Sequence, residues 1–234
     1  MKTLGLIGGV SWHSTLDYYR LINMAVEERL GPGHSARLVL YNVDLAEIRS
    51  LHARGDREGA ARVLEEAARS LAAAGAEMGL ICANTLHMYF DRVASAGGIP
   101  FIHIADAAAE RLLADGVRVV GLLGTKATME AGFYRERLAR HGVEVVVPGP
   151  REREEVDGII FRELVRGVFS EEARERVAEI ARGLADRGAQ GVLLACTELP
   201  LLMRGVDVGV PLYDTVELHV EKAVELAFRQ GVEE

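Results

Sequence analysis

Two cysteines are the side chains most suited to chemistry in this sequence, and each ends an apolar run. Cys82 lies in the segment LICANT, and Cys196 lies in LLACTE with Thr197 and Glu198 directly after it. Sites in parallel sheets form outside the carboxyl ends of the strands, where a thiolate can act as a base or nucleophile. Cys82 comes one residue earlier in its run, so its side chain is expected to point into the core, where a Cys is inert. The pattern therefore favours Cys196 as the reactive thiol and leaves Cys82 as a weaker candidate.

Hydroxyl and amide side chains follow the same runs and could bind an anion. The segment GLIGGVS ends a run in two glycines, and backbone N–H groups at a strand-to-helix turn bind carboxylates. Each polar residue alone is explained as well by a helix cap or a tight turn. Together they predict donors arranged around a carboxylate. The candidates are Ser11, Asn84, Thr85, Thr125, Thr128 and Thr197.

Two arginines stand out by position only. Arg49 follows a predicted strand end by a few residues, and Arg166 precedes Gly167 at a predicted helix end. The other arginines are typical of solvated helix faces. His87, one turn beyond the ANT segment, is more often a partly buried structural residue than a base.

Motifs for a metal or a dinucleotide are absent from the sequence. The two cysteines stand 114 positions apart (82 to 196) with no CxxC and no HExxH, which excludes a zinc site. The glycines at 5, 8 and 9 do not form GxGxxG, and Asp44 lies too far along to bind a ribose.

Composition limits the remaining classes. The chain has 49% hydrophobic and 26% charged residues, as soluble globular proteins do, and its net charge of −8 argues against nucleic acid. No run approaches the ~18 apolar residues of a membrane span. The segment MKTLGLIGG lacks the features of a signal peptide, and two cysteines without secretory signals are typical of reduced thiols. We therefore expect a cytoplasmic protein without membrane or nucleic-acid partners.

Apolar runs that alternate with helical patterns must position these residues. The alternation predicts parallel sheets with helices on both faces, an α/β fold. The helix from Asp56 to Ala74 is the most convincing, because apolar residues recur at helical spacing between a capping Asp and Gly75. Strands are predicted at 4–9, 36–43, 78–82, 99–104, 117–125, 143–148 and 191–196, and further helices at about 14–30, up to 141, 152–166, 171–187 and 215–229.

The second half of the sequence repeats the first. GLIGGVSWHST (5–15) resembles GLLGTKAT (121–128), and AAAGAEMGLICANT (72–85) resembles ADRGAQGVLLACTE (185–198). Aligning Gly75 with Gly188 sets Cys196 opposite Ala83. A slip of one residue would pair the two cysteines, but side chains on a strand alternate between faces, so the register matters.

The same segments, together with PFIHIADA and IIFRELVRG, resemble the pyridoxal-independent aspartate/glutamate racemases, and among them the broad-specificity amino-acid racemase branch. The resemblance covers nearly the whole chain. It implies two similar parallel-sheet α/β domains with the active site in the cleft between them. We expect residues 1–105 with 214–234 to form the first domain, the final helix packing back on it, and residues 106–213 the second.

The resemblance also implies racemisation or epimerisation at Cα of aspartate or glutamate, without a cofactor and without a metal. In such enzymes one thiol from each domain flanks Cα, and here Cys196 matches the second. Asn84, Thr85, Thr125, Thr128 and Thr197 match the donors, while Arg49 and Arg166 appear at the positions that hold the side-chain carboxylate. The ligand would be a small amino acid or dicarboxylate, and a homodimer is usual.

One position departs from the family pattern. The first catalytic residue stands before the Asn-Thr pair, and here that position is Ala83, which cannot carry a proton. This leaves three readings open: a racemase of acidic amino acids, a one-base enzyme such as a dicarboxylate decarboxylase or isomerase, and a protein that binds acidic amino acids with impaired catalysis.

Overall fold

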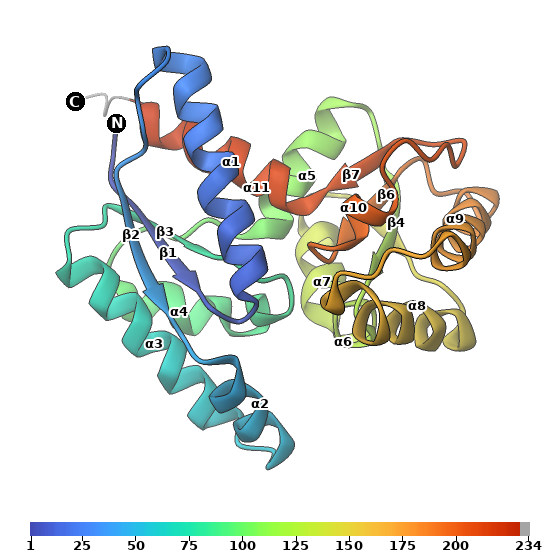
Figure 1. Ribbon diagram of the computed structural model, residues 1–234, viewed down its shortest axis with the longest axis horizontal. Coiled ribbons are helices and arrows are strands. Elements are labelled where there is room, and N and C mark those ends of the chain that lie inside the picture. Colours follow the sequence, from blue (N-terminus) through green and yellow to red (C-terminus); the bar gives the residue numbers. More distant parts are fainter. Residues whose placement is uncertain (230–234) are drawn as a thin grey trace. The chain divides into compact units, whose positions relative to one another are not determined.

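A computed structural model describes residues 1–229 of the chain. The chain forms two compact units, one of Met1–His103 with the chain from His219 on, and one of Ile104–Leu218. Each unit is built on one parallel β-sheet with helices around it (Figure 1). The predicted fold class, two parallel-sheet α/β halves, is confirmed. The expected domains, residues 1–105 with 214–234 and residues 106–213, stay a prediction, because compact units are not by themselves independently folding domains.

The first unit has three strands in the order β2-β1-β3, all parallel. Helices cover both faces of this sheet. A Cβ on Gly5 would meet Leu71 of α3, whereas a Cβ on Gly8, which points to the other face, would meet Thr15 of α1. The elements are β1 Leu4–Gly8, α1 Trp12–Leu30, β2 Leu38–Asn42, α2 Leu45–Ala53, α3 Arg57–Ala73, β3 Met78–Ile81, the 3-10 helix η1 Thr85–Tyr89, and α4 Phe90–Gly97.

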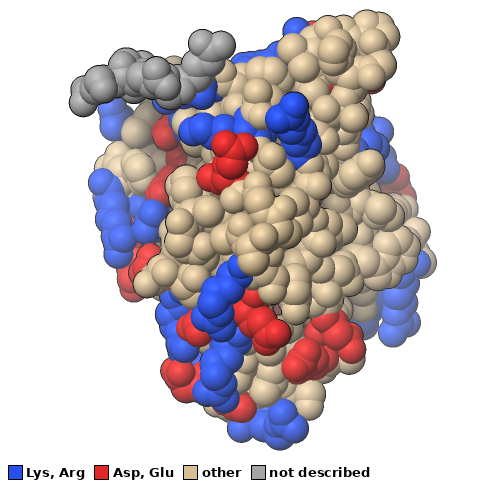
Figure 2. Space-filling model, turned by 90° about the vertical axis from the view of Figure 1, so that its left-hand side faces the viewer, with Lys and Arg blue, Asp and Glu red and all other residues tan. Residues whose placement is uncertain are grey.

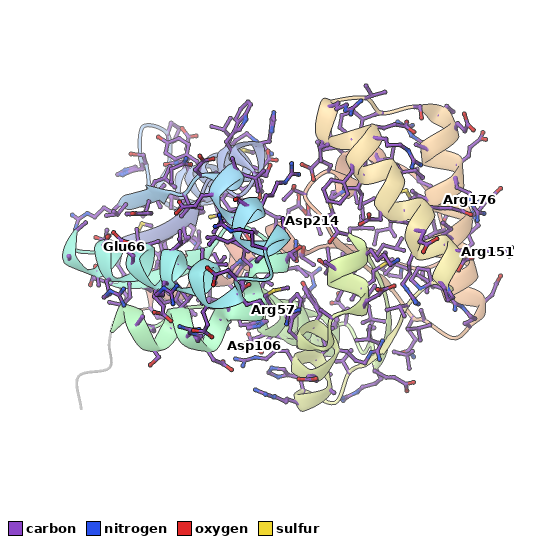
Figure 3. The ribbon with its side chains drawn as sticks, turned by 90° about the horizontal axis from the view of Figure 1, so that it is seen from below. Arg57, Glu66, Asp106, Arg151, Arg176 and Asp214 are labelled. Atoms are coloured by element: carbon purple, nitrogen blue, oxygen red, sulfur yellow. The ribbon has the colours of Figure 1, made fainter. Side chains whose placement is uncertain are left out.

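The second unit has four parallel strands in the order β5-β4-β6-β7. Its last helix, α11 (Thr215–Phe228), begins after β7 and continues into the first unit. Asp214, labelled in Figure 3, caps this helix by accepting from the Val216 N–H at 2.8 Å. The other elements are α5 Ile104–Ala114, β4 Val119–Gly124, α6 Lys126–Glu130, α7 Gly132–Arg140, β5 Glu144–Val146, α8 Pro150–Arg162, the 3-10 helix η2 Leu164–Arg166, α9 Glu171–Asp186, β6 Val192–Ala195, α10 Leu199–Leu202 and β7 Leu212–Asp214.

The helix predicted from Asp56 to Ala74 is confirmed as α3. Asp56 is its N-cap and accepts from the Gly59 N–H at 2.7 Å, and Gly75 follows with a φ of 89° that suits glycine. Its apolar stripe is buried except for Val63, which is half-buried. The buried residues on this stripe include Ala60, Leu64, Ala67 and Leu71.

The strand predicted at 99–104 is wrong. This segment makes a single bridge, in which the Gly79 N–H donates to Pro100 O and the Ile102 N–H donates to Gly79 O. The Phe101 ring occupies the space where a side chain on Gly79 would lie, and α5 already begins at Ile104. The apolar run is therefore buried by packing rather than by strand pairing.

Two further differences concern helices. The helix predicted to reach His141 is broken at Ala131, which has extended backbone (ψ 135°) between α6 and α7. The short helix α2 follows β2 and was not expected. Its N-cap is Asp44, whose carboxylate accepts from the Ala46 N–H at 2.9 Å.

Surface charges on the face shown in Figure 2 alternate in sign. Lys and Arg side chains lie among Asp and Glu side chains around a broad uncharged area. Within residues 1–229, no helix is both long and apolar enough to cross a membrane.

Candidate active site

The carboxyl end of β1 leads into a tightly bonded turn. Ser11 is the N-cap of α1, and its hydroxyl oxygen accepts from the Ser14 N–H at 3.4 Å. The Thr15 hydroxyl accepts from the Gly9 N–H at 2.9 Å and donates to Ser11 O at 3.0 Å. These bonds fix Ser11 beside the end of β3, because β1 and β3 are neighbours in the sheet.

The turn after β3 carries Cys82, Ala83, Asn84 and Thr85, and side chains hold its two leading carbonyls. The Ser14 hydroxyl donates to Cys82 O at 2.9 Å. Nδ1 of His87 lies 2.9 Å from Ala83 O, and since a carbonyl only accepts, Nδ1 carries the proton. Asn84 is buried and Thr85 is half-buried.

His87 belongs to a group of buried rings. Nε2 of His219 lies 2.9 Å from Ile102 O and must donate to it, so Nδ1 accepts from the Tyr18 hydroxyl at 2.7 Å. The His87 ring centroid lies 4.8 Å from that of His103 and 5.6 Å from that of His219. Burial, and then the nearby His87, lowers the pKa of His219 to about 3, so this ring is neutral near pH 7. These buried rings pack together next to the β3 turn, which His87 bonds through Ala83 O.

The strand registers show which residue of the first unit corresponds to Cys196. In the first sheet Gly5 pairs with Gly79, and in the second Gly121, at the corresponding place in GLLG, pairs with Val192. Counting forward by four residues from each pair sets Ala83 equivalent to Cys196. The structure therefore has the same correspondence as the sequence repeat.

The thiol of Cys82 is buried in the first unit's core, with 1% of the residue exposed. Burial raises the pKa of this thiol well above its ordinary value. A thiol in these surroundings is a poor acid or base.

Cys196 ends β6 and meets a carboxylate. Its Sγ donates to Oε2 of Glu198 at 3.1 Å, and the same oxygen accepts from the Thr197 hydroxyl at 2.7 Å. The residue is 9% exposed. Burial, and then the Glu198 carboxylate, raises the pKa of the Cys196 thiol, while the backbone N–H groups of Glu198 and Leu199 oppose that rise. Glu198 is not among the residues that the sequence singled out, although its position two after Cys196 was the available signal.

The turn after β4 lies beside Cys196, because Gly124 pairs with Ala195. Thr125 is the N-cap of α6, and its hydroxyl lies 3.1 Å from the hydroxyl of Thr128, which is fully buried. Asp157 of α8 accepts from the Lys126 N–H at 2.6 Å and so holds the start of α6. The predicted donors Thr125, Thr128 and Thr197 thus gather at adjacent strand ends.

The two predicted arginines lie at the surface. Arg49 is exposed on α2, and Arg166 is exposed at the end of η2, before Gly167 at φ 74°. His52, one turn beyond Arg49, bonds Tyr89 of η1 at 2.8 Å and ties α2 to the segment after the β3 turn. In the described part of the chain, no three or more His, Cys, Asp or Glu residues are grouped as metal ligands.

The sequence of this chain matches a known protein family. The sequence model of the Asp/Glu/hydantoin racemase family matches residues 7–223, nearly the whole chain. The chain belongs to this family. The racemase resemblance of the sequence segments is thereby confirmed.

Solved structures agree over the full length. A Yersinia pestis protein provisionally assigned as an Asp/Glu racemase is 46% identical, with a TM-score of 0.93, over 98% of this chain and 100% of that one. An aspartate racemase homologue from Pyrococcus horikoshii OT3 is 40% identical, with a TM-score of 0.88, over 98% and 100%. An aspartate racemase from Picrophilus torridus shares the fold, at 23% identity and a TM-score of 0.78 over 98% and 96%.

Proposed function

We propose that this protein is a cofactor-independent racemase or epimerase that acts at Cα of acidic amino acids, with Cys196 as its acid/base. The observation that carries the proposal is a thiol at the end of β6, bonded to a carboxylate, in a chain of the Asp/Glu/hydantoin racemase family. The names of the Yersinia and Pyrococcus relatives favour aspartate or glutamate as substrate. Two free cysteines fit a reducing compartment such as the cytoplasm.

The chemistry needs a base for a weakly acidic C–H bond. A Cys196 thiolate would remove the Cα proton, and the electron pair would move into the substrate carboxyl group as an enolate-like anion. Hydroxyl and amide donors stabilise such charge where it develops. Reprotonation on the opposite face, by a proton from water because Ala83 carries none, gives the other enantiomer.

The same proposal assigns roles to the remaining candidates. The guanidinium groups of Arg49 and Arg166 suit bidentate capture of the side-chain carboxylate, and their exposed positions leave them accessible to it. The proposed donors to the α-carboxyl group are Ser11, Asn84, Thr85, Thr125, Thr128 and Thr197.

A second candidate function is favoured by Ala83. Because its methyl group stands where Cys196 stands in the other sheet, the first unit offers no thiol at the equivalent position. A one-base enzyme would deprotonate or decarboxylate a dicarboxylate and return a proton from the Cys196 side alone.

One assay separates these functions. L- and D-Asp and L- and D-Glu are incubated with the protein in D₂O, and Cα deuteration, optical inversion and mass are followed. Inversion with deuterium uptake is the expected result. Exchange with retention would support the one-base reading, loss of a carboxyl group would support decarboxylation, and binding without either would leave an acidic-amino-acid-binding protein.

We also propose that the protein is a homodimer joined through α1. Trp12, Leu16 and Tyr19 are more than half exposed on this helix, and their spacing of four and three residues places them on one stripe. A shallow hollow beside the stripe is lined by side chains of both signs, among them Asp17 and Arg20. Arg20 pairs with Asp17 within the helix at 3.6 Å, and a two-fold axis would bring the arginine of each copy near an acid of the other.

The oligomeric state tests this interface. Size-exclusion chromatography coupled to light scattering should give twice the chain mass for the wild type and the mass of one chain for Tyr19→Glu. Glu66→Gln, at an exposed residue of α3, is the control and should stay dimeric. A wild-type monomer, or a dimer unaffected by Tyr19→Glu, would remove α1 as the interface.

A further inference from the structure

We propose that Glu198 is the proton partner of Cys196: the resting proton lies on the thiol and passes to the Glu198 carboxylate when the thiolate is needed. The inference rests on the proposed function, since it assigns the source of the base. It concerns a side chain that touches the reacting sulfur directly.

The geometry selects one oxygen of the carboxylate. Oε2 of Glu198 accepts from Cys196 Sγ at 3.1 Å and from the Thr197 hydroxyl at 2.7 Å. Both donors approach the same atom, so the carboxylate is held in place. In this bond the Cys196 thiol is the donor and Oε2 is the acceptor, so the proton lies on the sulfur.

Part of the surroundings of the Cys196 sulfur also favours its thiolate form. The nearby backbone N–H groups of Glu198 and Leu199 lower the pKa of the thiol and so favour a thiolate, and the Leu199 N–H also donates to Cys196 O at 3.2 Å. When the S–H bond breaks and an O–H bond forms on Oε2, one proton moves and the negative charge passes from the carboxylate to the sulfur. No other reactant takes part, and the total charge is unchanged.

Apolar side chains line the buried side of this pair, whereas Glu198 itself is half-buried. The side chains that α6, α8 and α9 contribute to the core cluster around Cys196 include Met129, Val156 and Val177, all apolar. Glu198 is the charged group that acts on the thiol. In an apolar setting, a proton shared over 3.1 Å responds strongly to a change of either partner.

The first unit shows what the pair adds. By the same register that relates Ala83 to Cys196, Thr85 occupies the place of Glu198. A hydroxyl group there cannot take up a proton near pH 7. The turn after β3 therefore has neither member of the pair.

Thiol titration tests the pair without turnover. In a Cys82→Ala background, the rate of Cys196 alkylation by iodoacetamide is measured from pH 6 to 10. Glu198→Gln removes the negative charge, so its midpoint should move to lower pH and its rate at pH 8 should rise at least about threefold. Glu198→Asp keeps the charge at a shorter reach and should fall between. Asp186→Asn, at the exposed end of α9, should titrate as the parent does.

The second measurement is the pH dependence of Cα deuterium exchange in the protein that keeps Cys82. The shape of this profile would not change if Glu198 had only a structural role. Glu198→Gln should lose activity selectively at low pH, by about tenfold per pH unit below the thiol midpoint, because the thiol must then ionise to solvent. The inference is wrong if Glu198→Gln lowers the exchange rate by the same factor at every pH. It is also wrong if the pH dependence of Cys196 alkylation is unchanged in both Glu198 variants. If no amino acid exchanges its Cα proton but the midpoint of Cys196 alkylation still shifts in Glu198→Gln, the proposed racemase function is wrong. The proton partnership between Glu198 and Cys196 is then still supported.

Discussion

The turn after β3 and the turn after β6 end equivalent strands, and they are held by different chemistry. In the first unit, buried imidazole and hydroxyl groups bond the turn's carbonyls, as His87 does with Ala83 O. In the second unit, the turn's own thiol, Cys196, and the Thr197 hydroxyl both donate to the Glu198 carboxylate. The buried histidines of the described chain, His87, His103 and His219, all lie in the first unit.

This difference shows how a duplicated framework divides its work. The same backbone position holds an apolar methyl group at Ala83 and a thiol at Cys196. Bonds to backbone carbonyls stabilise the conformation of the turn. A bond from a thiol to a carboxylate places a proton between two groups that can both accept it. We therefore expect substitutions in the two turns to have different kinds of effect.

The largest expected effect is on Cys196. Cys196→Ala removes the proposed base, so Cα deuterium exchange should fall by about 10³-fold, as loss of a general base does. The measurement is exchange by NMR in D₂O. Cys82→Ala is the matched control and should keep most of the exchange, because that thiol is buried in the core. Equal losses in both variants would break the comparison.

A thiol added to the first turn should sharpen the comparison. Ala83→Cys puts an acid/base group at the position equivalent to Cys196, and optical inversion should rise by about tenfold or more. Polarimetry or chiral chromatography measures it. Ala83→Ser adds a similar volume with a far weaker acid and should change little. No gain with Cys would mean that the two turns are not functionally equivalent.

Acid should weaken the first unit through its neutral imidazole. The pKa of His219 is lowered to about 3 in the folded protein, so between the ordinary 6.5 and that value the unfolded chain binds a proton that the folded chain does not. The free energy of unfolding should therefore fall with pH by up to about 1.4 kcal/mol per unit across this window. Urea unfolding from pH 7 to 4 measures the slope.

The variant His219→Gln keeps a donor and an acceptor but does not titrate, so its slope should be shallower. His34→Gln removes an exposed imidazole instead and should keep the wild-type slope. If His219→Gln and the wild type have the same slope, the acid sensitivity does not come from this ring.

The smallest effect is expected at Ser14. Ser14→Ala removes the donor to Cys82 O in a buried place and should lower the free energy of unfolding by about 1 kcal/mol, the usual net value of such a bond. Urea unfolding again measures it. Ser35→Ala, at an exposed serine, should be neutral. A neutral Ser14→Ala would mean that the first turn is not stabilised through this carbonyl.

The sequence could predict what depends on local pattern. The N-cap, apolar stripe and terminal glycine of α3 stand within one continuous segment, and the strand ends that carry Cys196 and the Asn-Thr pair follow from alternation of strands and helices. The repeat also predicted the relation between Ala83 and Cys196, because two parallel sheets of equal construction preserve register.

The remainder depends on contacts between distant segments. Residues 99–104 have a strand composition, but the Phe101 ring fills the space over Gly79, which the local pattern cannot show. The link from Tyr18 to His219 spans 201 positions, and no motif announces it. Glu198 was adjacent to the favoured thiol, yet only the Sγ–Oε2 distance shows that the two side chains meet.

The path of α11 has a consequence for synthesis on the ribosome. The first unit needs His219, held between Tyr18 and Ile102 O, and Ala227, whose carbonyl accepts from the Lys2 N–H at 2.8 Å. Both come after the whole of the second unit in chain order. Residues 104–218 can therefore be complete while the older part of the chain still waits for its last helix. The segment made first therefore lacks these two contacts until α11 has been made.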